Sequence, residues 1–209
     1  VITFWTGANA KPRGKKKKGN TSPRKQEGNF RAAARRLARL LNCNFDYHDV
    51  WVTLNYTIEP ESLEKAAHDL ELFRAKLSRY LKKEQKDVLT CVWVTSDMDG
   101  ETGAAVRPHH HLVMPCLPVE VVRRLWTHGS VDYQMLRDQD DYTPLAVYML
   151  RQVRHRADAK KFGSTRNLKQ PLVVDEYFVD PAKPLRAPST AVVQEAVIDA
   201  SAPVQYIRY

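Results

Sequence analysis

Three adjacent histidines at positions 109–111 follow a proline and precede the apolar run Leu112-Val113-Met114. This pattern predicts the start of a buried strand over residues 107–114. Because side chains alternate across a strand, His109 and His111 point to one face and His110 to the other. Two imidazoles on one rigid face are half of a metal site. The alternative is a set of polar side chains that are satisfied by hydrogen bonds.

A divalent ion that is held by two histidines usually needs at least one more protein ligand, often a carboxylate. Residues 88–95 predict a second strand next to the histidine strand, and Asp97 and Asp99 stand at its end. Either carboxylate could reach the metal across the strand pair. Asp97 is closer to the strand itself and is therefore the predicted third ligand.

Tyr148 is the second group that could do chemistry. Thr143 and Pro144 predict the cap and the first turn of a helix that runs to about residue 156. Tyr148 lies in this helix, and Arg151, three residues on, shares its face. A phenol has a pKa of about 10, so as a nucleophile it needs cationic neighbours or a general base. The alternative interpretation is a half-buried helix tyrosine.

Basic residues are concentrated in two stretches. Residues 1–43 contain 12 Lys or Arg and one acid, a balance of +11, whereas the other 21 Lys or Arg and 23 acids sum to −2. The basic end predicts contact with a polyanion, with a solubilising tail as the alternative. A second basic stretch, residues 160–169, contains Phe162 as a stacking face for an unpaired base. A solvated loop is the competing interpretation of that stretch.

The spacing of apolar residues predicts the elements that position these groups. Residues 30–43 predict a basic amphipathic helix, residues 50–57 a strand and residues 61–83 a long amphipathic helix. After the strand 88–95, residues 97–103 turn the chain into the histidine strand. A helix over 118–126, a strand near 130–134 and the tyrosine helix follow. This order predicts an α+β domain with an antiparallel sheet and helices on one face.

Composition predicts three parts of the chain. Residues 7–29 bury too little apolar surface to order themselves, so a basic flexible segment is expected over 1–29. The folded domain is expected over 30–179, and a tail with a short helix near 190–199 over 180–209. Three widely spaced cysteines favour a reduced intracellular protein, and no apolar run is long enough to span a bilayer. Val1 in place of methionine indicates a trimmed leader or a fragment.

The segments together resemble the HUH endonucleases, and most closely the rolling-circle replication initiator proteins of phages, plasmids and related mobile elements. The resemblance covers roughly residues 45–171. The chain departs from the family where His110 fills a hydrophobic slot, where Arg151 replaces a common lysine, and where Ser96-Asp97 replaces a frequent glutamate. The matching segments, in order, are Val52-Thr53-Leu54-Asn55-Tyr56, the histidine strand, Leu125-Trp126-Thr127-His128-Gly129-Ser130-Val131-Asp132, Leu145-Ala146-Val147-Tyr148-Met149-Leu150-Arg151-Gln152 and Ser164-Thr165-Arg166-Asn167-Leu168-Lys169-Gln170-Pro171.

The resemblance implies a five-stranded antiparallel sheet like that of RNA-recognition domains. It implies Tyr148 as the nucleophile, with Arg151 beside it, and Mg²⁺ or Mn²⁺ held by His109, His111 and the predicted Asp97. Residues expected to contact DNA lie in the matching segments and in the basic stretch: Thr53, Asn55, Arg154, Lys161, Arg166, Asn167 and Lys169.

The implied activity is cleavage of single-stranded DNA at a specific sequence or structure. A covalent 5′-phosphotyrosine would form and later rejoin DNA, initiating rolling-circle replication or transposition. Expected partners are single-stranded DNA or a DNA hairpin at an origin or element end, a host helicase and a polymerase. The expected compartment is a bacterial cytoplasm, or the nucleus in a eukaryotic source.

Two other function classes stay open. One is a non-catalytic single-stranded nucleic-acid-binding protein of the same fold. The other is a metal-dependent phosphodiesterase that uses water and leaves Tyr148 structural. Tyr133 and Tyr142 are rival nucleophiles, but neither is predicted to lie mid-helix beside a cation.

Overall fold

The computed structural model describes residues 2–5, 23–154, 161–172, 195–197 and 204–208, together with Ser189 and Val193. The chain divides into two compact units. The core unit is Asn20–Pro171, and the terminal unit combines Val1–Gly19 with Leu172–Tyr209. The predicted boundaries near residues 29 and 179 stay predictions.

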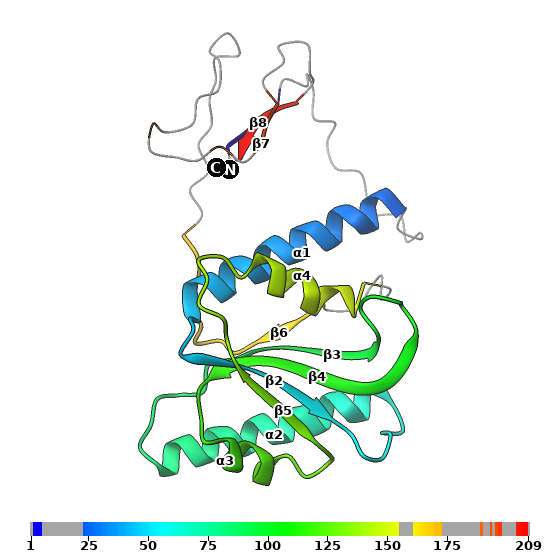
Figure 1. Cartoon of the computed structure of the whole chain (residues 1–209), viewed down its shortest axis with the longest axis vertical. Coiled ribbons are helices and arrows are strands. Elements are labelled where there is room, and N and C mark those ends of the chain that lie inside the picture. Colours follow the sequence, from blue (N-terminus) through cyan, green and yellow to red (C-terminus); the bar gives the residue numbers. More distant parts are fainter. Residues whose placement is uncertain are drawn as a thin grey trace, which may run out of the picture. The chain divides into compact units, whose positions relative to one another are not determined.

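The core unit is built on a five-stranded antiparallel sheet with the strand order β5-β2-β4-β3-β6 (Figure 1). This confirms the predicted α+β fold. The short strand β6 has no counterpart among the sequence predictions. The strands are β2 (Asp49–Asn55), β3 (Val92–Met98), β4 (Ala105–Pro115), β5 (Val131–Met135) and β6 (Gly163–Ser164).

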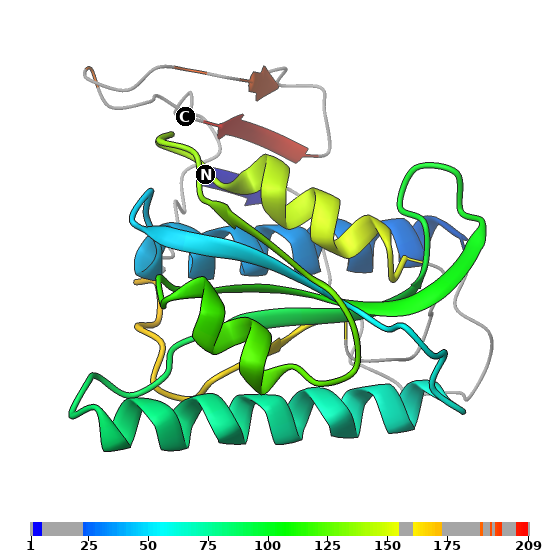
Figure 2. The same ribbon diagram turned by 60° about the horizontal axis from the view of Figure 1, so that its bottom comes forward.

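Helices cover both faces of this sheet, so the prediction of helices on one face is wrong (Figure 2). Helices α1 (Pro23–Asn44) and α4 (Thr143–Arg151) cover one face, and α2 (Leu63–Lys83) and α3 (Val119–Leu125) cover the other. The physical reason is that the strands are apolar on both faces. Val50, Val52 and Leu54 are buried on the α2 side, while Val94 and Val113 are buried on the α1 side.

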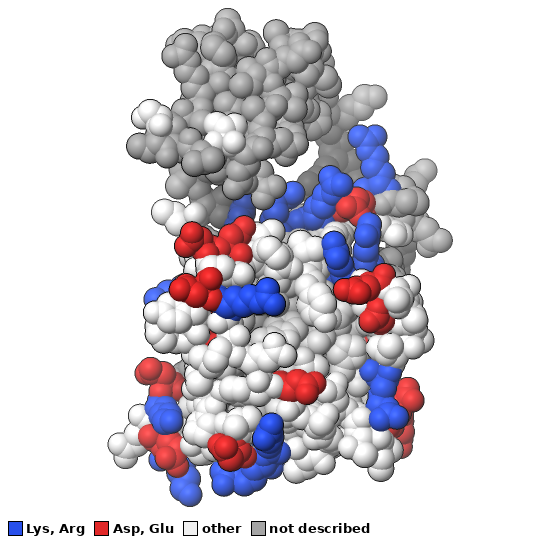
Figure 3. All heavy atoms as spheres, in the orientation of Figure 1, with Lys and Arg blue, Asp and Glu red and all other residues white. Residues whose placement is uncertain are grey.

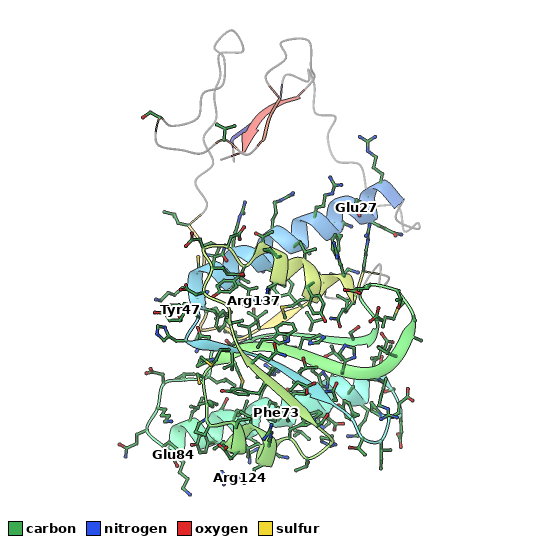
Figure 4. The ribbon with its side chains drawn as sticks, viewed as in Figure 1. Glu27, Tyr47, Phe73, Glu84, Arg124 and Arg137 are labelled. Carbon is green, nitrogen blue, oxygen red and sulfur yellow. The ribbon has the colours of Figure 1, made fainter. Side chains whose placement is uncertain are left out.

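Helix α2 follows its amphipathic pattern. The Ser62 side chain caps it by accepting the backbone N–H of Lys65. Its apolar stripe is buried against the sheet, and Phe73, labelled in Figure 4, lies between the helix and the strands. The stripe consists of Ala66, Leu70, Phe73, Leu77 and Leu81.

Helix α1 starts at Pro23, before the predicted start at residue 30. Residues 23–29, expected in the flexible segment, are therefore helical, while residues 6–22 lie outside the described residues. Contacts at the start of α1 account for the extra turns. Glu27 pairs with Arg31 and with Arg154, and the Arg154 guanidinium lies 5.1 Å from the ring centre of Phe30 (Figure 4 labels Glu27).

Helix α4 ends at Arg151 rather than near residue 156. Backbone bonds from Val153 to Leu150 and from Arg154 to Arg151 tighten the chain into a turn there. Residues 155–160 lie outside the described residues.

The terminal unit contains a three-stranded antiparallel sheet of order β1-β8-β7. Its strands are β1 (Ile2–Trp5), β7 (Glu195–Val197) and β8 (Val204–Arg208), and Ile2 is paired with Ile207. The short helix expected near 190–199 is therefore wrong over 195–197, because pairing with β8 holds these residues extended. No helix among the described residues is long and apolar enough to cross a membrane.

Candidate active site

The histidine strand β4 lies in the middle of the sheet, between β2 and β3. His109 is paired with Asn55 on β2 and with Ser96 on β3, and His111 is paired with Thr53. The rings of His109 and His111 lie 4.8 Å apart, centre to centre. The prediction that these two histidines share a face is confirmed.

His110 points to the opposite face, as predicted, and is buried beneath α2. Its Nδ1 lies 2.9 Å from Thr95 Oγ1, and its Nε2 lies 3.1 Å from the hydroxyl of Tyr56. Burial lowers the pKa of His110 to about 3, so the ring stays neutral. This polar contact set fixes β4 from below and leaves the other two histidines for the opposite face.

Both remaining imidazoles present Nε2 to one atom. The Oε1 of Gln152 lies 2.8 Å from His109 Nε2 and 2.9 Å from His111 Nε2. The Nδ1 of His109 donates to the backbone oxygen of Arg107, and Nδ1 of His111 lies 3.0 Å from the Thr53 hydroxyl. With its hydrogen on Nδ1, neutral His109 has a lone pair on Nε2.

This donor set fits a divalent cation. Two imidazole lone pairs and a carboxamide oxygen repel one another unless a cation lies among them, and partners on Nδ1 orient histidine ligands in this way. Turned about its amide, Gln152 could instead donate two N–H groups to the same nitrogens. Burial lowers the pKa of His111 to about 3, which keeps its ring neutral and able to bind metal.

Gln152 is fixed at both ends. It follows the last residue of α4 and is only 2% exposed, and its backbone oxygen accepts the hydroxyl of Ser96 at 2.7 Å. Ser96 therefore ties the end of α4 to strand β3. Sequence reasoning noted that Gln152 shares the helix face of Tyr148 but missed its role, because only the docking of α4 reveals it.

Tyr148 lies one helical turn before Gln152 and is 43% exposed. Its ring meets His111 edge-on, with ring centres 5.9 Å apart, and meets Trp51 at the same distance. Trp51 in turn stacks on His111 at 4.7 Å. Trp51, which the sequence indicated only as a strand residue, thus holds both rings.

A pocket joins Tyr148 to the histidine pair. Gly100 lets the β3–β4 loop approach the pocket, since an added Cβ there would lie 2.8 Å from Gln152 Cγ. The pocket is lined by Thr53, Asn55, Met98, Asp99, Gly100, Glu101, Val106, Arg107, His109, His111, Asp132, Tyr148 and Gln152.

Asp99, rather than the predicted Asp97, lines this pocket. The pairing of β3 with β4 is irregular between Ser96 and Met98, which changes the direction of the side chains that follow. Asp99 accepts hydrogen bonds from Thr102 and Glu101 in the turn, and these bonds lower the pKa of its carboxyl. Among the described residues, no three His, Cys, Asp or Glu side chains are grouped to hold a metal. The role of Asp97 stays a prediction.

Two predicted DNA contacts lie in the pocket. Thr53 holds His111, and Asn55 donates to Asp132 at 3.0 Å. Arg151 is exposed at the end of α4.

The other predicted DNA contacts lie outside the pocket and partly hold the fold. Lys161 donates to the backbone oxygen of Val153, and Asn167 donates to that of Leu89. Arg154 is engaged by Glu27, while Arg166 and Lys169 are exposed. Their DNA contacts stay predictions.

The rival tyrosines lie elsewhere. Tyr133 donates its hydroxyl to the Leu117 backbone oxygen at 2.5 Å, and the Tyr142 hydroxyl donates to Arg137 at 3.1 Å. Burial raises the pKa of both phenols, which makes the phenolate less accessible. Neither residue lines the pocket.

A model of the replication-associated protein family ORF2 matches residues 49–153. The chain belongs to this family. The matched segment runs from β2 to just beyond α4, so it includes the histidine pair, Tyr148 and Gln152. Membership in this replication-associated family indicates a role as a replication initiator. The comparisons with curated proteins and with solved structures give no match.

Proposed function

We propose that this member of the replication-associated family nicks and rejoins single-stranded DNA through a covalent bond to Tyr148, in the manner of the HUH endonucleases that it resembles. One observation carries the proposal. A tyrosine hydroxyl, two oriented imidazoles and a buried carboxamide oxygen face one pocket within a segment that matches a replication family.

The reaction is a displacement at phosphorus. The Tyr148 oxygen forms a bond to the scissile phosphorus while the bond from phosphorus to the 3′ oxygen breaks. The phenol hydrogen passes to the departing 3′ oxygen, giving a 5′-phosphotyrosine and a free 3′-hydroxyl. The phosphodiester energy is kept in the new bond, so a 3′-hydroxyl can reverse the step. Arg151 supplies positive charge near the phosphate.

The chain would hold Mg²⁺ or Mn²⁺ at His109, His111 and Gln152. When bound, the cation would polarise the phosphate and offset the charge that develops on it. Trp51 and Thr53 keep the His111 ring in place, and Ser96 keeps Gln152 in place. These residues make the site rigid before substrate arrives.

The charge on α1 supports a polyanionic substrate. Its exposed face carries Arg31, Arg35, Arg36 and Arg39, and Figure 3 shows Lys and Arg side chains gathered over this helix. Helix α1 lies before the family-matched segment and packs on α4. A DNA strand that is held by this face would run along the helix that carries Tyr148.

The test is capture of the covalent product. The full chain is incubated with a labelled pool of single-stranded oligonucleotides and Mn²⁺, and adducts are separated under denaturing conditions. Adducts are expected with the wild-type chain and are expected to be lost in Tyr148→Phe and in EDTA. An adduct that persists in Tyr148→Phe would overturn the assignment of the nucleophile.

The same experiment separates the alternatives. A phosphodiesterase that uses water would cleave without an adduct, and Tyr148→Phe would still cleave. A non-catalytic binder would show salt-sensitive binding that is unaffected by EDTA, with no cleavage.

A further inference from the structure

A second hollow lies beside the candidate active site, at the end of strand β2. It belongs to neither the histidine pocket nor the apolar clusters alone. It is lined by Thr57, Ile58, Trp126, Thr127, His128 and Gly129.

The walls of this hollow are held by backbone bonds. The N–H of Thr57 donates to the His128 oxygen at 2.8 Å, and the indole N–H of Trp126 donates to the Asn55 oxygen at 2.9 Å. Gly129 allows this close approach, because an added Cβ would lie 2.3 Å from the Asn55 oxygen. The hollow is therefore preformed rather than created by a ligand.

The chemistry of the hollow combines apolar and polar surface. Ile58 is 83% exposed, which is unusual for a large aliphatic side chain, and lies next to the indole and imidazole rings of Trp126 and His128. Those two rings are 4.9 Å apart. His128 Nε2 lies 3.9 Å from Asp69 Oδ1, which orients the imidazole. An apolar face with polar groups at its rim suits a flat heterocycle that has hydrogen-bonding edges.

The hollow and the histidine pocket are neighbours on one strand. Asn55 lines the pocket and Thr57 lines the hollow, two residues or about 7 Å further along the chain. Arg107 connects them. It lines the pocket, and its Nη1 donates to the backbone oxygens of Tyr56 and Thr57. A strand whose phosphate lies at the histidines has its adjacent nucleotide within reach of the hollow.

We infer that the hollow takes an unpaired nucleobase next to the scissile phosphate and so determines where the strand is cut. This inference rests on the proposed nicking function. Stacking of a base against side chains is sequence-tolerant, whereas the His128 imidazole and the backbone at the rim distinguish one base edge from another.

The test uses the full chain and single-stranded DNA randomised over about 20 positions, with Mn²⁺. Adducts are isolated, and the attached and released strands are sequenced. The wild-type chain is expected to favour one base at one position flanking the attached phosphate. Ile58→Ala is expected to reduce that preference about tenfold, because apolar contact with the base is lost.

Val88→Ala is the matched control. Val88 is also an exposed aliphatic residue, at 75%, but it lies before β3, at the end of the sheet away from the histidines. It is expected to keep the wild-type preference. A flanking preference that is unchanged in Ile58→Ala would overturn the inference, even though adducts form.

A binding assay tests the hollow without relying on cleavage. Tyr148→Phe is titrated with an oligothymidylate of about 12 nucleotides and with an abasic strand of equal length, in the presence of Mg²⁺. The base-bearing strand is expected to bind about tenfold more tightly, and Ile58→Ala should narrow that ratio. Equal affinities, or a ratio that Ile58→Ala does not change, would overturn the inference. The absence of adducts alone would overturn only the nicking proposal.

Discussion

At the scale of single residues, the candidate site depends on a glutamine. Gln152 brings an uncharged oxygen to two neutral histidines, where a carboxylate was expected from the sequence. A neutral third ligand leaves more positive charge on a bound cation than a carboxylate would. That charge is then available to the phosphate of the substrate.

Gln152→Leu is expected to weaken Mn²⁺ binding by about 10-fold to 100-fold, since it removes a donor and leaves the histidine nitrogens unsupported. Gln152→Glu should bind Mn²⁺ at least as tightly as the wild type. Isothermal titration of the full chain with Mn²⁺ measures both affinities.

Asp97→Asn decides between the two candidate ligands. If Gln152 is the third ligand, Asp97→Asn should leave the Mn²⁺ affinity unchanged. A large loss of affinity in Asp97→Asn, with little change in Gln152→Leu, would restore the ligand that the sequence predicted.

At the scale of elements, α4 is held between α1 and the sheet. Leu37 and Leu41 on α1 are fully buried in the cluster that also contains Ala146, Met149 and Leu150 of α4. The helix that carries Tyr148 is thus positioned partly by a helix outside the family-matched segment.

Leu37→Ala is expected to destabilise the core unit by about 2–5 kcal/mol, because it removes buried methyl groups and leaves a cavity. Arg35→Ala, an exposed change two residues away on the same helix, should alter stability by no more than about 0.5 kcal/mol. Urea unfolding of each variant gives the free energies. Equal stabilities for the two variants would show that α1 does not pack as described.

Most elements could be predicted from local patterns, whereas their docking could not. Alternating apolar residues gave β2 and β4 nearly to the residue, and helical spacing gave α2. The two-residue strand β6 has too few residues to carry a pattern. The irregularity after Ser96, which directs Asp99 rather than Asp97 into the pocket, depends on how a whole hairpin closes. The role of Gln152 was missed for the same reason, since its partners lie some 40 residues earlier in the chain.

At the scale of the whole molecule, charge and thiol exposure are unevenly distributed. The arginines of α1 lie on one face of the core unit, while the basic residues at the end of α2 lie over the opposite sheet face. These two sets can be compared directly because both are exposed.

Replacing Arg35, Arg36 and Arg39 together with Gln should lower the slope of log affinity against log salt by about 2, at about 0.7 for each lost phosphate contact on a single strand. Fluorescence anisotropy with a labelled oligothymidylate at several salt concentrations measures the slope. The matched control replaces Arg79, Lys82 and Lys83 on α2 with Gln, which removes the same charge. An equal fall in slope for the control would mean that α1 has no special role.

The three thiols should react at very different rates. Cys43 and Cys116 are exposed, whereas Cys91 is buried, and burial raises the pKa of its thiol to about 12. At a pH of about 8, iodoacetamide is expected to modify Cys43 and Cys116 and to reach Cys91 only when the core unit unfolds. Mass spectrometry of peptides along a urea series would follow this. Rapid modification of Cys91 in native conditions would contradict the burial.

The pairing of β1 with β8 closes the polypeptide into a ring, because Ile2 is opposite Ile207 (Figure 1). A fluorophore attached at each terminus would therefore report energy transfer while the terminal unit is folded and lose it when that small sheet opens. The same closure makes the chain a candidate for circular permutation, with a short peptide joining the old ends and new ends at the exposed bend near Ile58. Such a permutant would place its new ends directly at the rim of the inferred base site.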